Sequence, residues 1–358
     1  MVDENNRNPI YPIIPSEDTF PESRGSKRVI GYFLNYETQN IRREQLEKLT
    51  HAIFAFVPLN SDGTFEFQDE RSQERLKSLR NKARRTGVKV LFSTDGRWMG
   101  EEFRQVVGDP VKQRTFINSI LAFLNEYQLD GIELNWKWPK TPDQFKYSEL
   151  LEKLRESFNN QYILCVAVPP AGIEDWVTGF DFDEIIEHCD FINVFSTDYN
   201  GPWDNQWGTP SGPMSPLYSG VGDRKNFNVD YTMQYYIQKT REPGKLNILI
   251  PFGIRLWRNV EEGEGPVRNV ELVDGKAVGV ICMSRGKAKE DGWQLTNPEW
   301  DEESKSSFFY EKGVYLTFET GKSVRAKLNY VDQMKLGGVC IWSVDMDDEE
   351  DSLLNFCF

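Results

Sequence analysis

Three polar side chains recur at every second position within the stretch Asp130–Pro139. Successive side chains of a β-strand point to opposite faces, so Glu133, Asn135 and Lys137 would share one face. Burying a carboxylate, an amide and an amine is costly, and these groups therefore need partners or a ligand. Charged groups at the carboxyl end of a strand, with tryptophans between them, indicate the floor of a site. The alternative is a half-exposed strand whose polar face is solvated.

Short apolar runs alternate with helix-periodic segments along most of the chain. Eight runs of this kind predict eight strands, and such alternation is typical of a parallel sheet. Eight repeats favour a closed (β/α)8 TIM barrel of the α/β class over an open sheet. The predicted strands are Val29–Leu34, His51–Val57, Lys89–Ser93, Gly131–Lys137, Ile163–Val168, Phe191–Ser196, Asn247–Phe252 and Gly338–Val344. The predicted helices include Arg71–Arg85, Phe116–Tyr127, Phe145–Phe158 and Lys322–Gln333.

One interval after the seventh predicted strand departs from the alternation of strands and helices. It contains glycine-rich turns, a hairpin signal at Asp274-Gly275 and a strand-like run at Ala277–Met283. We therefore predict a small α+β insertion that raises one wall of a cleft. The predicted organisation is an N-terminal tail (1–27), a first barrel part (28–255), the insertion (256–321) and a second barrel part (322–358).

In such barrels, functional residues gather at the carboxyl ends of the strands. An aromatic cleft with scattered polar groups suits a sugar chain, because the C–H faces of sugars pack on flat rings while their hydroxyls form hydrogen bonds. The alternative for any one tryptophan is packing in the core or in a lid. The candidate ligand-binding residues are Tyr32, Phe56, Trp98, Lys137, Asp198, Tyr199, Trp203, Arg255 and Trp342.

Composition excludes several other functions. The chain has 42 basic and 56 acidic residues, a formal charge of −14, which argues against nucleic acid as a partner. No apolar run approaches the ~20 residues of a membrane span. The five cysteines are dispersed and only His51 and His188 are present, so we predict neither a metal site nor a cofactor. Cys165 and Cys340 lie in apolar runs and are predicted to be buried free thiols.

The chain resembles glycoside hydrolase family 18, the chitinases and chitinase-like lectins, over roughly residues 28 to 356. Val29–Phe33 is similar to the first strand of that family, Phe54–Phe56 to its second, and Asp190–Val194 leads into its sixth-strand motif. Asp130–Pro139 falls on the signature strand, and Gly337–Asp348 matches the eighth strand most specifically. The resemblance also implies an α+β insertion after strand seven.

The resemblance implies a chemistry that this chain does not preserve. The family signature is Asp-Gly-x-Asp-x-Asp-x-Glu, whose Glu protonates the glycosidic oxygen while the N-acetyl group of the substrate attacks the anomeric carbon. Here Asp130 is kept, Glu133 and Asn135 replace the next two carboxylates, and Lys137 replaces the proton donor. With a reference pKa of ~10.4, lysine is a poor acid, and its charge opposes an oxocarbenium-like centre. The sixth-strand tyrosine is also replaced, by Thr197.

Three functions remain open. The first is a catalytically silent protein that binds chitin or N-acetylglucosamine oligomers. The second is a pseudoenzyme that acts as a protein-interaction surface, with Lys137 paired to Glu133 or Asp198 and blocking the sugar position. The third is a weak hydrolase that uses relocated carboxylates. The carboxylates of Glu133 and Asp198 are also expected to resist any lowering of the Lys137 pKa by burial. The compartment stays open, because the family is mostly secreted but Met1–Phe20 shows no signal-peptide pattern.

Overall fold

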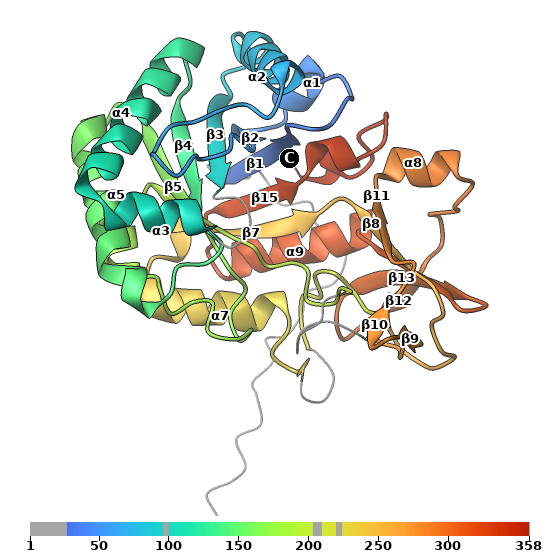
Figure 1. Cartoon of the computed structure of the whole chain (residues 1–358). Coiled ribbons are helices and arrows are strands. Elements are labelled where there is room, and N and C mark those ends of the chain that lie inside the picture. The colour runs from blue at the N-terminus through green and yellow to red at the C-terminus, as the bar shows by residue number, and fades with distance from the viewer. Residues whose placement is uncertain (1–26, 96–99, 203–209, 220–223, 358) are drawn as a thin grey trace, which may run out of the picture.

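Eight parallel strands close into a barrel at the centre of the molecule (Figure 1). The structure is a computed structural model that describes residues 27–95, 100–202, 210–219 and 224–357. Neighbouring strands follow the order β1-β15-β7-β6-β5-β4-β3-β2, which confirms the predicted (β/α)8 barrel. The strands are β1 Arg28–Leu34, β2 His51–Ala55, β3 Lys89–Asp95, β4 Gly131–Asn135, β5 Ile163–Val168, β6 Phe191–Val194, β7 Leu246–Pro251 and β15 Gly338–Trp342.

Helices surround the barrel on its outer side (Figure 1). Helix α4 begins at Pro110 rather than at the predicted Phe116, because the side chain of Asp109 accepts hydrogen bonds from the backbone of Val111 and Lys112. The polar first turn concealed this start from hydrophobic periodicity. The helices are α1 Arg43–Leu46, α2 Glu70–Ala83, α3 Glu101–Gly108, α4 Pro110–Tyr127, α5 Gln144–Phe158, α6 Phe182–His188, α7 Val229–Thr240, α8 Arg285–Glu290 and α9 Gly321–Gln333.

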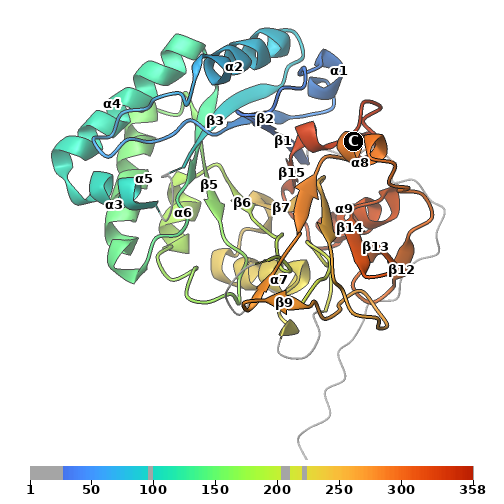
Figure 2. The same cartoon turned by 45° about the vertical axis from the view of Figure 1, so that its right-hand side comes forward.

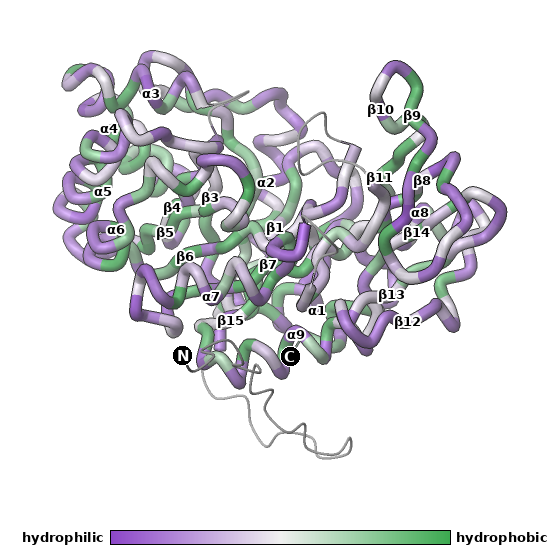
Figure 3. Tube along the Cα trace, turned by 90° about the horizontal axis from the view of Figure 1, so that it is seen from below, coloured by the Kyte–Doolittle hydropathy of each residue, from purple (hydrophilic) through white to green (hydrophobic). Residues whose placement is uncertain are grey.

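Two layers of buried side chains follow from the alternation along each strand. In β4, Ile132 and Leu134 belong to the large core between the barrel and its helices, so Glu133 and Asn135 face the barrel interior. A separate apolar cluster that includes Ile30 and Leu249 fills this interior. Cys165 and Cys340 belong to it as buried free thiols, as predicted. Figure 3 shows hydrophobic residues along the central strands.

The predicted α+β insertion follows β7 and forms a second sheet beside the barrel (Figure 2). The predicted hairpin is present, with Asp274 at φ 52° and Gly275 at φ 77° between its two strands. The larger sheet of the insertion has the order β11-β8-β14-β13-β12, and the hairpin forms a separate two-stranded sheet. The predicted boundaries between the domains remain predictions. The elements are β8 Ile254–Trp257, β9 Leu272–Val273, β10 Lys276–Ala277, β11 Ile281–Met283, β12 Glu299–Asp301, β13 Ser306–Glu311 and β14 Val314–Phe318.

Gly131, at the start of β4, is required by close packing. A Cβ atom at this position would lie 2.2 Å from the backbone oxygen of Ile163 on β5, which cannot move without breaking the β4–β5 pairing. We expect Gly131→Ala to lower the free energy of unfolding by about 1–3 kcal/mol, measured by urea denaturation. Gly108→Ala is the matched control, because a Cβ atom there meets no heavy atom within 4 Å. Equal stability of the two variants would contradict this account.

Candidate functional site

Glu133 is the centre of a buried hydrogen-bond cluster inside the barrel. Its carboxylate accepts hydrogen bonds from Tyr32 Oη at 2.6 Å, Ser93 Oγ at 2.7 Å and Asn193 Nδ2 at 2.6 Å. The parallel register places Ser93 directly beside Glu133. Burial raises the pKa of Glu133, and the three hydrogen bonds oppose this shift without cancelling it. The carboxylate has no exposed surface, so it cannot reach a ligand in the cleft.

The cluster continues across the barrel toward its amino-terminal end. Asn193 Oδ1 accepts a hydrogen bond of 2.9 Å from Asn247 Nδ2. Asn247 Oδ1 in turn accepts one of 2.9 Å from Arg28 Nε. These contacts join β4, β6, β7 and β1 through polar side chains inside an otherwise apolar interior. A buried polar network is stable only when its polar groups have hydrogen-bond partners. Around Glu133 this condition is met, because the carboxylate accepts three hydrogen bonds.

Lys137 lies at the carboxyl end of β4 and is partly buried. Its Nζ lies 5.3 Å from the centre of the Phe56 ring and 5.6 Å from that of Phe195, within the range of cation–π attraction. The predicted ion pair with Glu133 or Asp198 is not made, and no described residue forms a salt bridge or hydrogen bond with this amine. Instead, Glu133 is held by its three donors and Asp198 by Arg255.

Burial and nearby charge act on the pKa of Lys137 in opposite directions. Burial lowers the pKa and is the larger effect, while the charges of Asp95, Asp198 and Glu133 raise it. The carboxylates thus resist the effect of burial, as expected, but do not cancel it.

Three aromatic rings lie at the mouth of the barrel, and two of them, Phe56 and Phe195, face the amine. Trp342 packs against Phe56 and Phe195, with ring centres 5.8 and 5.6 Å apart. Trp342, Phe56, Phe195 and Lys137 are all partly exposed, whereas Tyr32 below them is fully buried. These side chains therefore form the upper surface of the site, and the Glu133 cluster lies beneath it. Peptide bonds at three of these strand ends are cis, namely Ala55–Phe56, Lys137–Trp138 and Trp342–Ser343.

Asp198 and Arg255 form a second polar element beside this surface. Arg255 Nη2 lies 2.8 Å from Asp198 Oδ1, and Arg255 Nη1 donates a hydrogen bond of 2.6 Å to the backbone oxygen of Asn200. The guanidinium is buried, whereas the Asp198 side chain keeps 45% of its surface exposed. The two predicted ligand-binding residues are thus brought together, and Asp198 is the one that offers an exposed oxygen.

Two of the predicted ligand-binding residues lie below the surface of the site. Tyr32 and Tyr199 are fully buried, and their hydroxyls bond to Glu133 and Thr232, so neither offers a surface to a ligand. Asp130 also has a structural position, because its carboxylate accepts a hydrogen bond from the backbone of Val90. Trp98 and Trp203 lie outside the described residues.

Sequence reasoning missed Ser93, Asn193 and Phe195 as members of the site. Strand alternation was applied only to β4 in the sequence. The same two-residue period relates Asn193 on β6 to Phe195 just after it, and applying it to β3 and β6 would have made these residues candidates. Thr197, which replaces the family tyrosine, is buried, and its hydroxyl has no hydrogen-bond partner within the described part of the chain.

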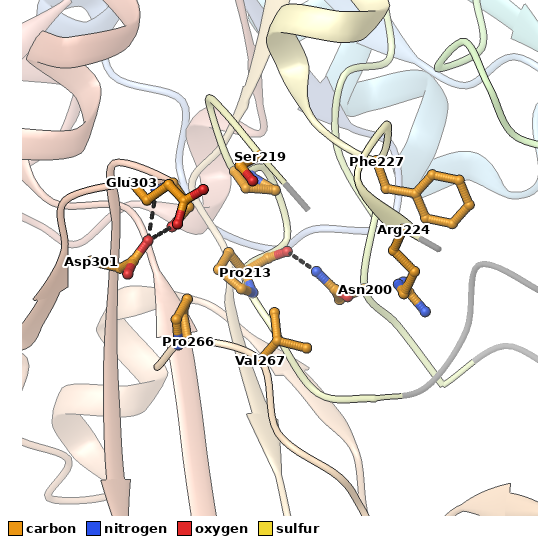
Figure 4. Close-up of a pocket in the computed structure, with 11 residues that line it drawn as sticks. Asn200, Pro213, Ser219, Arg224, Phe227, Pro266, Val267, Asp301 and Glu303 are labelled. Carbon is orange, nitrogen blue, oxygen red and sulfur yellow. Dashed lines mark hydrogen bonds between the residues drawn. The ribbon is translucent and has the colours of Figure 1, made fainter. Parts of the chain in front are cut away.

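A small pocket is lined in part by Asn200 (Figure 4), whose backbone oxygen accepts the hydrogen bond from Arg255. It opens between the loops after β6 and the insertion, where Asn200 Nδ2 donates a hydrogen bond of 2.8 Å to Pro213 O. Arg224 and Asp301 face it from opposite sides. In the described residues, no group of three His, Cys, Asp or Glu side chains could hold a metal ion. No helix there is both long and apolar enough to cross a membrane.

The comparisons with known proteins agree with this architecture. The family described as glycosyl hydrolases family 18 matches residues 28–347, and the chain belongs to that family. Mouse Chitotriosidase-1 is 27% identical over 332 residues, which cover 86% of this chain and 68% of that protein. Probable chitinase 10 of Drosophila melanogaster is 25% identical over an alignment of 379 positions, which covers 95% of this chain. The chain spans only 16% of the length of the fly protein.

A solved structure gives the same fold at lower sequence identity. Catalytic domain 2 of the Group II chitinase from Ostrinia furnacalis, a mutant in complex with an N-acetylchito-oligosaccharide, has a TM-score of 0.80. It is 24% identical, and the match covers 93% of this chain and 95% of that chain. This chain is therefore a chitinase-like family member with the complete barrel of its relatives.

Proposed function

We propose that this chain is a non-hydrolysing member of the family that binds chitin-type amino-sugar oligomers at the carboxyl end of the barrel. The observation that carries the proposal is an amine, Lys137, at the position of the family's proton donor on the signature strand. General acid help accounts for about 10²–10⁴ in rate, and a cation there also opposes the positive charge of the transition state.

Relocated carboxylates do not replace the missing acid. Glu133 is fully buried and accepts three hydrogen bonds, so a glycosidic oxygen cannot approach it. Asp198 is partly exposed, but its Oδ1 lies 2.8 Å from Arg255 Nη2, so this carboxylate is already engaged by a cation. The geometry therefore supports loss of hydrolysis rather than a shifted mechanism.

Sugar binding is supported by the aromatic surface that remains. Trp342 is partly exposed among other rings, and flat rings pack on the C–H faces of sugars. The Ostrinia domain, whose barrel superposes on this one, was solved with an N-acetylchito-oligosaccharide bound. The partner that we propose is accordingly an amino-sugar oligomer.

A titration with N-acetylchitotetraose tests both parts of the proposal. We expect saturable quenching of tryptophan fluorescence, and at least a tenfold weaker affinity in Trp342→Ala. Turnover of a fluorogenic chito-oligosaccharide should stay at the rate of buffer alone. Trp300→Ala is the control, because Trp300 lies on β12 of the insertion. No fluorescence change at millimolar sugar, or turnover above background that disappears in Glu133→Gln, would contradict the proposal.

A protein-interaction surface is the second candidate. Its support is the exposed apolar side chains of the insertion, where Leu272, Val273 and Ile281 have exposed fractions of 44, 50 and 46%. Leu272 and Val273 lie on strand β9 of the hairpin and Ile281 lies on β11, and exposed apolar side chains of this kind can dock a partner protein. If the sugar titration fails while the chain is folded, this second function becomes the better account.

A further inference from the structure

Among the residues that the structure describes, none places a counter-charge in contact with the cation at the mouth of the barrel. Lys137 Nζ lies between the rings of Phe56 and Phe195, and in the described parts of the chain it makes neither a salt bridge nor a hydrogen bond. A partly buried ammonium group is stable only when a partner compensates its lost hydration. The amine therefore has unused capacity to bind an acceptor.

The nearest carboxylates are already engaged with other groups. Glu133 accepts hydrogen bonds from Tyr32, Ser93 and Asn193, while Asp198 pairs with Arg255. Together with Asp95 they act on Lys137 only at longer range, and burial still lowers the pKa of this lysine. An acceptor supplied by a ligand would meet the ammonium directly.

Asn135 provides an independent observation on the same strand face. It is the last residue of β4 and points to the barrel interior, two residues before Lys137, whose Nζ faces the rings of Phe56 and Phe195. Asn135 is fully buried, yet neither its amide nitrogen nor its amide oxygen has a hydrogen-bond partner among the residues described. Buried amides are nearly always hydrogen-bonded in folded proteins. The neutral amide of Asn135 therefore stands on the signature strand where the family has a carboxylate, so it does not repel an anion that binds Lys137.

We propose that the ligand of this site is an anionic saccharide, whose carboxylate or sulfate group is bound by the partly exposed Lys137 Nζ while its ring packs on Trp342. This inference rests on the proposed function and narrows its ligand class. The family signature has carboxylates at positions 135 and 137, which would repel such a group. The exchange to an amide and an amine therefore changes the charge preference of the site as well as removing the acid.

Two tetrasaccharides of equal length test the inference. A hyaluronan tetrasaccharide alternates N-acetylglucosamine with glucuronate, whereas N-acetylchitotetraose carries no charge. We expect calorimetry to show about 10- to 100-fold tighter binding of the hyaluronan fragment, the range expected for hydrogen bonds to a charged group. A 6-O-sulfated chitotetraose forms the second arm, and the tighter of the two anionic ligands identifies the anionic group.

Variants of Lys137 separate charge recognition from general binding. In Lys137→Met, the ratio of affinities for the charged and neutral tetrasaccharides should fall to about one, while Lys137→Arg should retain a ratio well above one. Binding of chitotetraose without any preference for charge would overturn the inference and leave the proposed function intact. Preference for hyaluronan that survives in Lys137→Met would also overturn it. If no tetrasaccharide binds the folded chain, both the inference and the proposed function are wrong.

Discussion

Replacing Glu133 by alanine is expected to lower the free energy of unfolding by about 3–5 kcal/mol, because three buried donors lose their acceptor together. Tyr32, Ser93 and Asn193 all donate to this carboxylate from different strands of the barrel. No exposed surface is available through which water could replace it. Urea denaturation followed by circular dichroism measures the change, and the melting temperature should fall by on the order of 10 °C.

Glu133→Gln is the matched control for this prediction. Glutamine keeps the size of the side chain and one carbonyl oxygen, so it can still accept hydrogen bonds, and we expect a loss of only about 1–2 kcal/mol. If the alanine and glutamine variants were equally stable, the three hydrogen bonds would not be what holds this part of the barrel together.

Replacing Arg75 by methionine is expected to cost about 3–5 kcal/mol at pH 7, because it leaves a buried carboxylate without its cation. The ion pair of Arg75 with Asp345 is buried, with exposed side-chain fractions of 8 and 4%. Arg75 Nε also donates to Leu34 O at 2.8 Å, and Asp345 Oδ2 accepts from Leu34 N at 2.7 Å. The pair thus fastens α2 to the end of β1 and to the segment after β15.

The cost of this substitution should depend on pH in a defined direction. Burial raises the pKa of Asp345 from its usual 3.8 to about 6, although Arg75 lowers it. Because the folded-state pKa lies above the unfolded value, the stability linked to protonation is fully present below pH 3.8 and is lost as the pH rises through about 6. Removing Arg75 raises this pKa further. The stability gap between Arg75→Met and the parent should therefore be largest above pH 6 and should narrow toward pH 4.

Two further variants complete this test. Arg43→Met removes an exposed pair with Glu47, whose side chains are 49 and 50% exposed, and should change stability by less than about 1 kcal/mol. In Arg75→Met/Asp345→Asn, the pH dependence of the gap should disappear because no carboxylate remains to titrate. A gap that does not vary with pH in the single variant would show that the charge of Asp345 is not involved.

The barrel was predictable because its signals are local. Apolar runs and helical periodicity along the chain identify the eight strands, and the turn chemistry of Asp274-Gly275 identifies the hairpin of the insertion. The shared face of Glu133 and Asn135 follows from strand alternation alone. Helix α4 was shortened in the prediction because its first turn is polar and is set by the cap at Asp109.

The contacts of the site were not predictable in the same way. Tyr32 lies 101 residues from Glu133 in the sequence, and Asn193 lies 60 residues from it. No local pattern indicates that these side chains meet, so Glu133 was expected to pair with Lys137 and Tyr32 was expected to contact a ligand. Register across the closed barrel decided both questions, because it places Ser93 beside Glu133 and directs its neighbours inward.

The sequence alone determined the family scaffold and the loss of the acid, since Lys137 and Asn135 occupy signature positions whatever surrounds them. Only the tertiary structure decided that Glu133 is saturated with donors while the ammonium of Lys137 and the amide of Asn135 lack partners in the described chain. The physical reason is that residue type fixes which bonds a group can form, whereas burial and long-range neighbours fix which of those bonds are already made.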